Sequence, residues 1–410
     1  MAVTGSITTR FIDEKGVDLG KTLIEKDYLI SVYPNLLNQF DTPMLMTWGF
    51  NANNGNLGDN TTTNRSSPVQ TIAYGANWKQ VSSGSYHTAC IKTDGTLWIW
   101  GWNYRGQIGD NTSTNVSSPV QTITFGTNWK NVSSGVDHCA AIKTDGTLWC
   151  WGRNIYGQLG DNTITDKSSP VQTIAFGTNW KQVSAGNGTF AAGGNNTAAI
   201  KTDGTLWCWG LNSTGQLGDN TVINRSSPVQ TIAFGTNWKQ VSAGNGNFAA
   251  IKNDGTLWTC GYNLYGQLGD NSIVKKSSPV QTVAYGTNWK QVSCGHSHTA
   301  AIKTDGTLWI WGGNTTYGNL GDNTTVSRSS PVQTIAYGTN WKSVTCASQH
   351  TAAIKTDGTL WIWGDNQYGQ LGNNTLVSKS SPIQTILYGP TWKSVSCGQF
   401  HAAAIKDGDF

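Results

Sequence analysis

The sequence predicts an all-β fold, a seven-bladed β-propeller of four-stranded blades whose closing blade is shared between the N- and C-termini. Three recurring phrases support this prediction. Asp-Gly-Thr-Leu-Trp recurs at a spacing of roughly 51 residues, typical of propeller blades, and begins at Asp94, Asp145, Asp203, Asp254, Asp305 and Asp357. Asn-Trp-Lys or Thr-Trp-Lys occurs seven times, and so does Ser-Ser-Pro-(Val/Ile)-Gln-Thr. Seven copies of so long a unit indicate seven blades.

Each repeat is expected to form four short strands. In the unit that begins at Pro68, the expected strands are residues 69–72, 79–82, 87–92 and 96–100. Asp94 and Gly95 separate the last two strands. Asp-Gly between alternating apolar segments is the strongest short hairpin signal, because both turn residues must tolerate a positive φ. Four strands per repeat is the composition of a propeller blade.

The two chain ends supply the missing parts of one blade. Residues 42–49 align with residues 95–101 as a degenerate fourth strand, and residues 401–408 supply a third strand before the chain stops. We expect the closing blade to take three strands from the C-terminus and its fourth from residues 43–49. Closing the ring in this way removes the open sheet edges that invite aggregation.

Composition and charge argue against several classes of protein. The chain has 410 residues, a net charge of +4 and 12% charged residues, so no bulk field favours nucleic-acid binding. No apolar run approaches the roughly 18–20 residues of a membrane helix, so we expect no membrane insertion. The N-terminus also lacks a basic segment followed by an apolar core, and we expect no secretory signal. These features fit a virion protein or a cytoplasmic protein better than a secreted one.

Most chemically reactive side chains follow the repeat. One repeat position holds either histidine or asparagine: His87, His138, Asn196, Asn247, His298, His350 and His401. This exchange predicts a hydrogen-bonding role rather than a metal site, because the ligands of one ion must all lie about 2 Å from it. Nineteen of the twenty tryptophans occupy three repeat positions, with Trp102 the exception, and the eight cysteines form no Cys-x-x-Cys pair. We expect no catalytic residues, no metal site and no cofactor.

Two features depart from the repeat and are candidates for binding. Six blades place a cation directly before Ser-Ser-Pro, which we call the cationic rim: Arg65, Lys167, Arg225, Lys276, Arg328 and Lys379. The rim could be solvated charge beside acidic neighbours, or a surface for an anionic glycan, a phosphate or a protein. The second feature is an insertion at residues 186–196, with Asn187, Thr189, Phe190 and Asn195 as candidate contacts. Because strands alternate in direction, this insertion lies on the same face as the long loops that follow Trp-Gly.

Residues 1–41 have no repeat character and form a candidate docking arm, ahead of the propeller at residues 42–410. Residues 7–11 are expected to form a strand and residues 21–33 a short helix that ends before Pro34. The arm enters the propeller on the face of the Asp-Gly turns. Its candidate docking residues are Phe11, Leu19, Leu23, Tyr28, Leu29 and Tyr33.

The repeat resembles that of the regulator of chromosome condensation family. The resemblance rests on Trp-Gly-x-Asn-x-x-Gly-Gln-(Leu/Ile)-Gly, seen at residues 100–109, 151–160, 209–218 and 363–372, followed by Ser-Gly-x-x-His-Thr-Ala. It covers about residues 42–410 and implies the propeller fold. The family's exchange factor engages a small GTPase and chromatin, but residues 1–41 have no basic tail, and we do not extend exchange activity to this chain. The arm is similar to N-terminal segments of tailed-phage structural proteins.

Three functions follow as expectations. The first is a non-enzymatic phage virion protein, present in multiple copies, docked on other virion proteins through residues 1–41 and displaying the propeller for host contact or decoration. The second is a soluble protein-binding propeller, similar to an exchange factor or to the β-lactamase inhibitor of this family, in the cytoplasm or outside the cell. The third is an adhesin that binds a host glycan.

Overall fold

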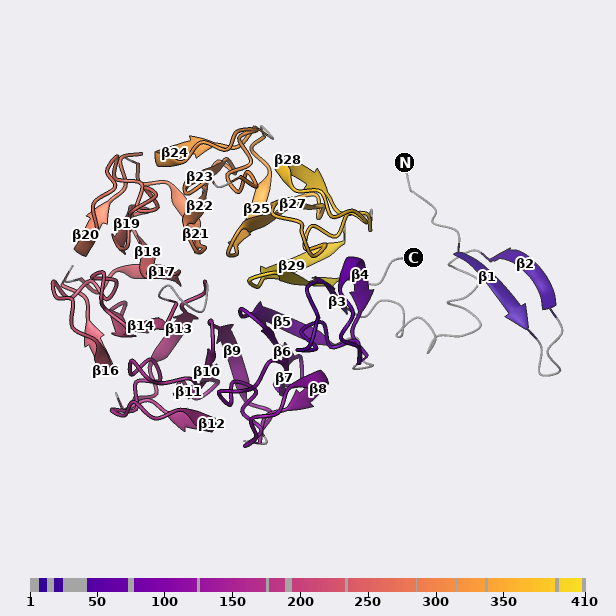
Figure 1. Ribbon diagram of the computed structural model, residues 1–410, viewed down its shortest axis with the longest axis horizontal. Coiled ribbons are helices and arrows are strands. Elements are labelled where there is room, and N and C mark those ends of the chain that lie inside the picture. Colours follow the sequence, from indigo (N-terminus) through magenta and orange to yellow (C-terminus); the bar gives the residue numbers. More distant parts are fainter. Residues whose placement is uncertain are drawn as a thin grey trace.

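The propeller is a ring of seven four-stranded antiparallel sheets (Figure 1). The computed structural model describes residues 7–12, 18–24, 43–72, 77–123, 126–174, 177–188, 194–232, 235–284, 286–314, 316–335, 338–387 and 391–407. Among these residues, no helix has the length and apolar character needed to span a membrane. The all-β, seven-bladed prediction is confirmed.

From the axis outward, blade 1 consists of β5 (Trp78–Ser83), β6 (His87–Lys92), β7 (Leu97–Gly101) and β8 (Val116–Gln121). Blade 2 consists of β9 (Trp129–Ser134), β10 (His138–Lys143), β11 (Leu148–Gly152) and β12 (Lys167–Gln172). Blade 3 consists of β13 (Trp180–Ala185), β14 (Asn196–Lys201), β15 (Leu206–Gly210) and β16 (Arg225–Gln230).

Blades 4 to 6 keep the same order. Blade 4 consists of β17 (Trp238–Ala243), β18 (Asn247–Lys252), β19 (Leu257–Gly261) and β20 (Lys276–Gln281). Blade 5 consists of β21 (Trp289–Cys294), β22 (His298–Lys303), β23 (Leu308–Gly312) and β24 (Arg328–Gln333). Blade 6 consists of β25 (Trp341–Cys346), β26 (His350–Lys355), β27 (Leu360–Gly364) and β28 (Lys379–Gln384).

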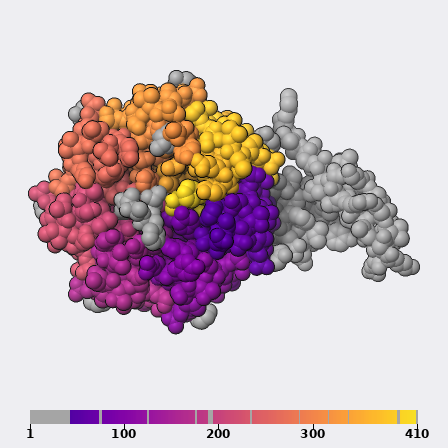
Figure 2. All heavy atoms as spheres, in the orientation of Figure 1, coloured from indigo at the N-terminus to yellow at the C-terminus, as the bar shows by residue number. Residues whose placement is uncertain are grey.

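Blade 7 joins the two ends of the chain, but not in the predicted proportion. Its sheet order is β29 (Trp392–Cys397), β30 (His401–Lys406), β3 (Met44–Gly49) and β4 (Arg65–Gln70). Two strands therefore come from each end, and the expected division of three and one was wrong. The Ser-Ser-Pro strand folds back as an antiparallel partner of the preceding Trp-Gly strand, so it closes a blade rather than opening the next. Figure 2 shows the yellow C-terminal atoms packed beside the indigo N-terminal strands.

The Asp-Gly turns between the second and third strands form for local reasons. Gly95 has φ +82°, and a Cβ there would lie 2.0 Å from the Thr127 carbonyl oxygen of the next blade, so only glycine fits. The Asp94 carboxylate accepts hydrogen bonds from the backbone N–H and the hydroxyl of Thr96, at 2.9 and 2.7 Å. These bonds lower the pKa of Asp94, the backbone bond most. The hairpin turn predicted at Asp-Gly is confirmed, but the positive φ is found at the glycine alone and not at Asp94.

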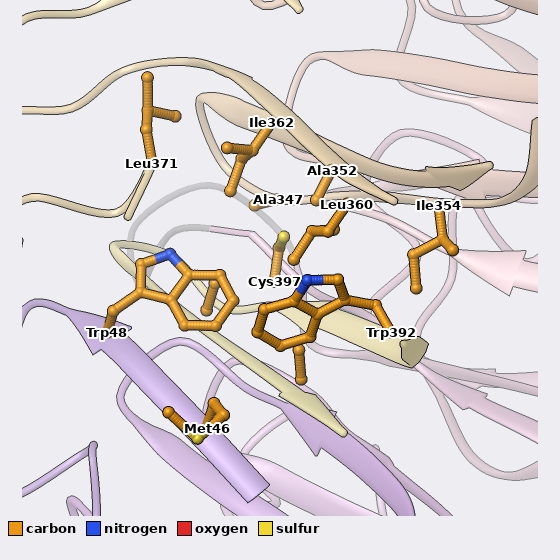
Figure 3. Packing of buried hydrophobic residues seen from close by; sticks show 12 residues of the cluster. Met46, Trp48, Ala347, Ala352, Ile354, Leu360, Ile362, Leu371, Trp392 and Cys397 are labelled. Atoms are coloured by element: carbon orange, nitrogen blue, oxygen red, sulfur yellow. The ribbon is translucent and has the colours of Figure 1, made fainter. Parts of the chain in front are cut away.

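Tryptophans hold six of the seven blades to the preceding blade. The indole of Trp48 in blade 7 donates a hydrogen bond to the Gln370 carbonyl oxygen of blade 6 at 2.8 Å, and its ring meets Trp392 edge-on at 6.1 Å (Figure 3). Trp100, Trp151, Trp209, Trp311 and Trp363 make the equivalent bond in five other blades. Each buried indole thus adds apolar contact area to the interface between two blades, and its N–H group has a hydrogen-bond partner there.

The innermost strands have their axis-facing edges closed by side chains of the preceding blade. The Gln80 amide donates to the Val132 carbonyl oxygen at 2.9 Å and accepts from the Val132 N–H at 3.2 Å. The Ser82 hydroxyl accepts from the Ser134 N–H at 2.8 Å. Corresponding serines bond in the same way at five further blade junctions. The serine of this strand at six junctions, and the glutamine at four of them, therefore bond backbone groups that would otherwise be free at the axis-facing edge.

Outside the ring, β1 (Ile7–Ile12) pairs antiparallel with β2 (Asp18–Ile24). The expected strand at residues 7–11 is confirmed. The expected helix at residues 21–33 is wrong for residues 21–24, because their backbone pairs with β1 instead. Of the candidate docking residues, Phe11, Leu19 and Leu23 lie within these two strands. The other three, Tyr28, Leu29 and Tyr33, lie outside the described residues, and docking by the arm stays a prediction.

Candidate functional site

The cations of the rim lie around the outer circumference, a whole blade apart from one another (Figure 1). Each is the first residue of the outermost strand of its blade. Five of the six pair with an aspartate six residues earlier, at N–O distances of 2.9–3.9 Å: Arg65–Asp59, Lys167–Asp161, Arg225–Asp219, Lys276–Asp270 and Arg328–Asp322. The sixth, Lys379, has Asn373 at that position. Loop carboxylates therefore compensate most of the rim charge, and ligand binding there stays a prediction.

The repeated histidines are buried and link neighbouring blades. His138 Nε2 lies 2.9 Å from the Thr197 hydroxyl of the next blade, and His298 Nε2 lies 2.8 Å from that of Thr351. In the blade that follows His350, Ala402 takes the place of this threonine. His350 Nε2 therefore has no hydrogen-bond partner among the described residues. Burial lowers the pKa of all five histidines to about 3. The hydrogen-bonding role predicted for this position is thus confirmed for His87, His138, His298 and His401, whereas His350 Nε2 and the Asn247 side chain have no hydrogen-bond partner among the described residues.

The insertion reaches from blade 3 across the axis of the propeller. The Asn187 amide donates to the Cys397 carbonyl oxygen of blade 7 at 3.2 Å, and the Ser85 hydroxyl of blade 1 donates to the Gly188 carbonyl oxygen at 2.9 Å. Asn195 is buried and accepts a hydrogen bond from Gln158 at 3.1 Å. The remaining two candidates, Thr189 and Phe190, lie outside the described residues. The insertion therefore meets blades 1 and 7 on the long-loop face.

An aromatic cluster lies on the same face, over three adjacent blades. It consists of Phe50, Tyr86, Trp102, Tyr104, Tyr368 and Phe400. These residues come from the Trp-Gly loops of blades 6, 7 and 1 and from the turns between the first two strands of blades 7 and 1. Tyr104 is 66% exposed, and the other five are half-buried.

The rings of the aromatic cluster form one continuous surface. Phe50 is its centre, with ring centroids 5.0 Å from Tyr368, 6.0 Å from Tyr86 and 6.3 Å from Phe400. The row of rings continues from Tyr86 to Trp102, whose ring centroids are 6.1 Å apart, and from Trp102 to Tyr104, whose centroids are 5.6 Å apart. All five contacts are edge-to-face, the arrangement that aromatic quadrupoles favour. The rings of the cluster are thus packed against one another within the propeller itself.

The comparisons with known proteins bear on the whole ring. The model of the RCC1-like domain matches residues 188–409, and that of the regulator of chromosome condensation (RCC1) repeat matches residues 45–91, 94–142 and 145–192. The ultraviolet-B receptor UVR8 of Arabidopsis thaliana is 31% identical over 347 residues, which are 83% of this chain and 77% of the receptor. The chain belongs to the RCC1-like family.

This RCC1-like propeller is also similar to larger and more distant proteins. The human E3 ubiquitin-protein ligase HERC2 is 27% identical over 337 residues, which are 79% of this chain but 7% of the ligase. The crystal structure of Prp20p from Saccharomyces cerevisiae matches with a TM-score of 0.79 at 18% identity, over 90% of this chain and 92% of that chain. At this identity, the likeness to Prp20p concerns the fold alone.

An ion pair borders the aromatic cluster of the RCC1-like propeller in blade 2. Asp137 and Arg153 occupy the repeat positions of Tyr86 and Trp102, and their oxygen and nitrogen lie 3.1 Å apart. Burial raises the pKa of Asp137 to about 6 although Arg153 acts in the opposite direction. Burial also raises the pKa of Tyr86, with smaller contributions from Tyr368 and Asp137. The residues before the repeated histidine and after Trp-Gly are thus aromatic in blades 7 and 1, and they form an ion pair in blade 2.

Departures from the repeat are the feature of the sequence that marks this cluster. Trp102 was the one tryptophan outside the repeat positions, and it lies within the cluster. The residue after Trp-Gly is aromatic in blades 7 and 1, as is the residue after the corresponding Cys-Gly of blade 4. The residue before the repeated histidine is aromatic in blades 7 and 1. The N-terminal half of blade 7, which holds Phe50, directly precedes blade 1 in the chain, whereas the C-terminal half, which holds Phe400, joins them only when the ring closes. Their rings are separated by up to 350 residues in the chain, from Phe50 to Phe400.

Proposed function

We propose that this RCC1-like propeller is a non-enzymatic protein-binding module that docks its partner on the aromatic cluster of the long-loop face. The observation that carries this proposal is the cluster itself, six rings from three blades in continuous contact at a solvent-exposed surface. Exposed aromatic surface rimmed by polar residues is characteristic of protein interfaces, where Trp and Tyr supply much of the binding energy.

The adjacent elements give this surface a polar border. The buried Asp137–Arg153 pair borders it in blade 2, and Asn187 and Gly188 of the insertion bond beside the turns that hold Phe400 and Tyr86. A rigid aromatic centre within a polar border is the usual composition of a protein interface. A partner seated on the cluster would therefore also touch the insertion, which is unique to blade 3 in this chain.

The family supports protein binding over the other expectations. One solved structure is of yeast RCC1 (Prp20) bound to Kap60, and another report describes the binding of Prp20p to Gsp1p and histones. These statements concern those proteins, and the partner of this chain is a matter for experiment. Placement in a virion, docking on virion proteins and contact with a host receptor or glycan stay predictions, because none of these relatives bears on them.

Replacing the exposed Tyr104 and the half-buried Trp102 of the cluster tests the proposal. We expect the double variant Trp102→Ala, Tyr104→Ala to bind its partner at least about tenfold more weakly, because the Trp and Tyr residues that anchor an interface typically contribute about 2 kcal/mol or more. The matched control is Leu264→Ala, Tyr265→Ala in the corresponding loop of blade 4, where both side chains are exposed. The measurement is quantitative affinity capture from cells that make the protein.

The comparison between the two variants decides the outcome. Proteins that the wild type and the blade 4 control recover, and that the cluster variant loses, support docking on the aromatic cluster. If the cluster variant recovers the same proteins in the same amounts as the wild type, the aromatic cluster is not the docking surface.

A further inference from the structure

The insertion of blade 3 holds Asn187 and Gly188 in direct contact with each other. The Gly188 N–H donates a hydrogen bond to the side-chain Oδ1 of Asn187, the residue directly before it, at 2.9 Å. The Nδ2 of the same side chain donates to the Cys397 carbonyl oxygen of blade 7 at 3.2 Å. Both partners are backbone groups of fixed polarity, so these two bonds together set the orientation of the Asn187 amide.

This contact brings together the two atoms that react when an asparagine loses its side-chain amide. In that reaction the backbone nitrogen of the following residue attacks the side-chain Cγ and forms a C–N bond. The amide nitrogen leaves as ammonia, taking the proton of the attacking N–H, and water then opens the cyclic succinimide at either carbonyl to give aspartate or isoaspartate. Asn187 Cγ is bonded to the oxygen that lies 2.9 Å from the Gly188 nitrogen, so the reacting atoms are held close together. Glycine also has no Cβ to hinder the approach.

The chain has two other Asn-Gly pairs, at residues 54–55 and 245–246, and both are arranged differently. The glycine N–H donates to the Asn51 carbonyl oxygen at 3.2 Å in the first pair and to the Gly244 carbonyl oxygen at 3.1 Å in the second. In both, the nitrogen that would attack is bonded to a backbone carbonyl instead of the side chain that would react. The pair at 245–246 shares the local sequence Ala-Gly-Asn-Gly with the insertion, so the tertiary structure makes the difference.

The side chain that would react is also the one that ties the insertion to blade 7. We propose that Asn187 is a site of spontaneous deamidation, with the Gly188 nitrogen as the nucleophile, and that the reaction detaches the insertion from blade 7. The carboxylate product has no N–H to donate, and it places an oxygen against the Cys397 carbonyl oxygen. Cys397 ends β29, three residues before Phe400 of the aromatic cluster. The reaction therefore alters the border of that surface as the protein ages.

Peptide mapping of the purified full chain tests the reaction. The chain is incubated in a mildly alkaline buffer, and mass spectrometry follows the conversion of each Asn-Gly pair to aspartate and isoaspartate. We expect conversion at residues 187–188 to be at least about tenfold faster than at 245–246, because only the first pair holds its reacting atoms together. In concentrated urea, where the structure is lost, the two pairs are expected to react within about twofold of each other. Equal rates in the folded chain, or faster conversion at 245–246, would overturn the proposal.

A variant that carries the product's carboxylate from the start tests the detachment. Chymotrypsin cleavage after Phe190, within the insertion, reports how readily this segment opens. We expect Asn187→Asp and the aged wild type to be cleaved there several-fold faster than freshly purified wild type, and the matched control Asn54→Asp to be cleaved at the fresh wild-type rate. If Asn187→Asp is cleaved no faster than fresh wild type, the bond to Cys397 does not hold the insertion and its release by deamidation is refuted. Neither experiment involves a partner, so both leave the proposed function untouched.

Discussion

Lowering the pH from 7 to 5 is expected to destabilise this propeller by several kcal/mol and to unfold it near the lower value. The five repeated histidines are fully buried, and burial lowers their folded-state pKa to about 3. In the unfolded chain the pKa is about 6.5, so below that pH only the unfolded state takes up these protons. The stability is complete above pH 6.5 and is lost progressively as the pH falls towards 3.

The size of the effect follows from the number of histidines. Each imidazole costs roughly 2 kcal/mol at pH 5, so that five approach about 10 kcal/mol, against a typical stability of about 5–15 kcal/mol. Asp137 opposes this trend, because its pKa is raised to about 6 and the folded state binds its proton more readily, but it is one group against five. The measurement is the urea midpoint by tryptophan fluorescence between pH 7 and pH 4.5.

One variant separates the histidines from general acid effects. His350→Asn places in blade 6 the residue that blades 3 and 4 already carry, at a position whose Nε2 has no hydrogen-bond partner among the described residues. We expect it to fold at pH 7 and to unfold at a lower pH than the wild type, because one protonation site is gone. An unchanged acid midpoint in this variant would show that the buried histidines do not set the acid limit.

Replacing Trp48 with alanine is expected to reduce the free energy of unfolding by roughly 3–5 kcal/mol, the usual cost of deleting a buried tryptophan. Trp48 is fully buried, meets Trp392 edge-on and bonds to Gln370 across the interface with blade 6 (Figure 3). Its blade is the one whose strands come from the two chain ends, so only non-covalent contacts keep the ring closed there. Urea denaturation of Trp48→Ala measures the loss.

The matched control removes an aromatic side chain that the core does not use. Tyr104→Ala changes a residue that is 66% exposed, and we expect its stability to stay within about 0.5 kcal/mol of the wild type. A Trp48→Ala midpoint shift no larger than that of Tyr104→Ala would contradict the role assigned to Trp48 in ring closure.

The candidate site was harder to predict than the fold, and particular residues show why. The cationic rim was visible in the sequence because it recurs before every Ser-Ser-Pro but one, yet the same repeat supplies its aspartate partners. The aromatic cluster, in contrast, breaks the repeat, and Phe50 and Phe400 are at opposite ends of the chain. The distance between these two residues in the sequence does not indicate that they meet, because their contact forms only when the ring closes.

The sequence by itself determined that the chain is a seven-bladed propeller closed by its own two ends. Hairpin turns and alternating strands depend on near neighbours, and seven copies of one unit repeat that local information. The tertiary structure alone decided that each end contributes two strands, because a Ser-Ser-Pro strand borders two blades in sequence and only sheet pairing assigns it to one. It also decided which exceptions to the repeat meet on one face, since those contacts depend on the ring closure that brings the C-terminal half of blade 7 to its N-terminal half.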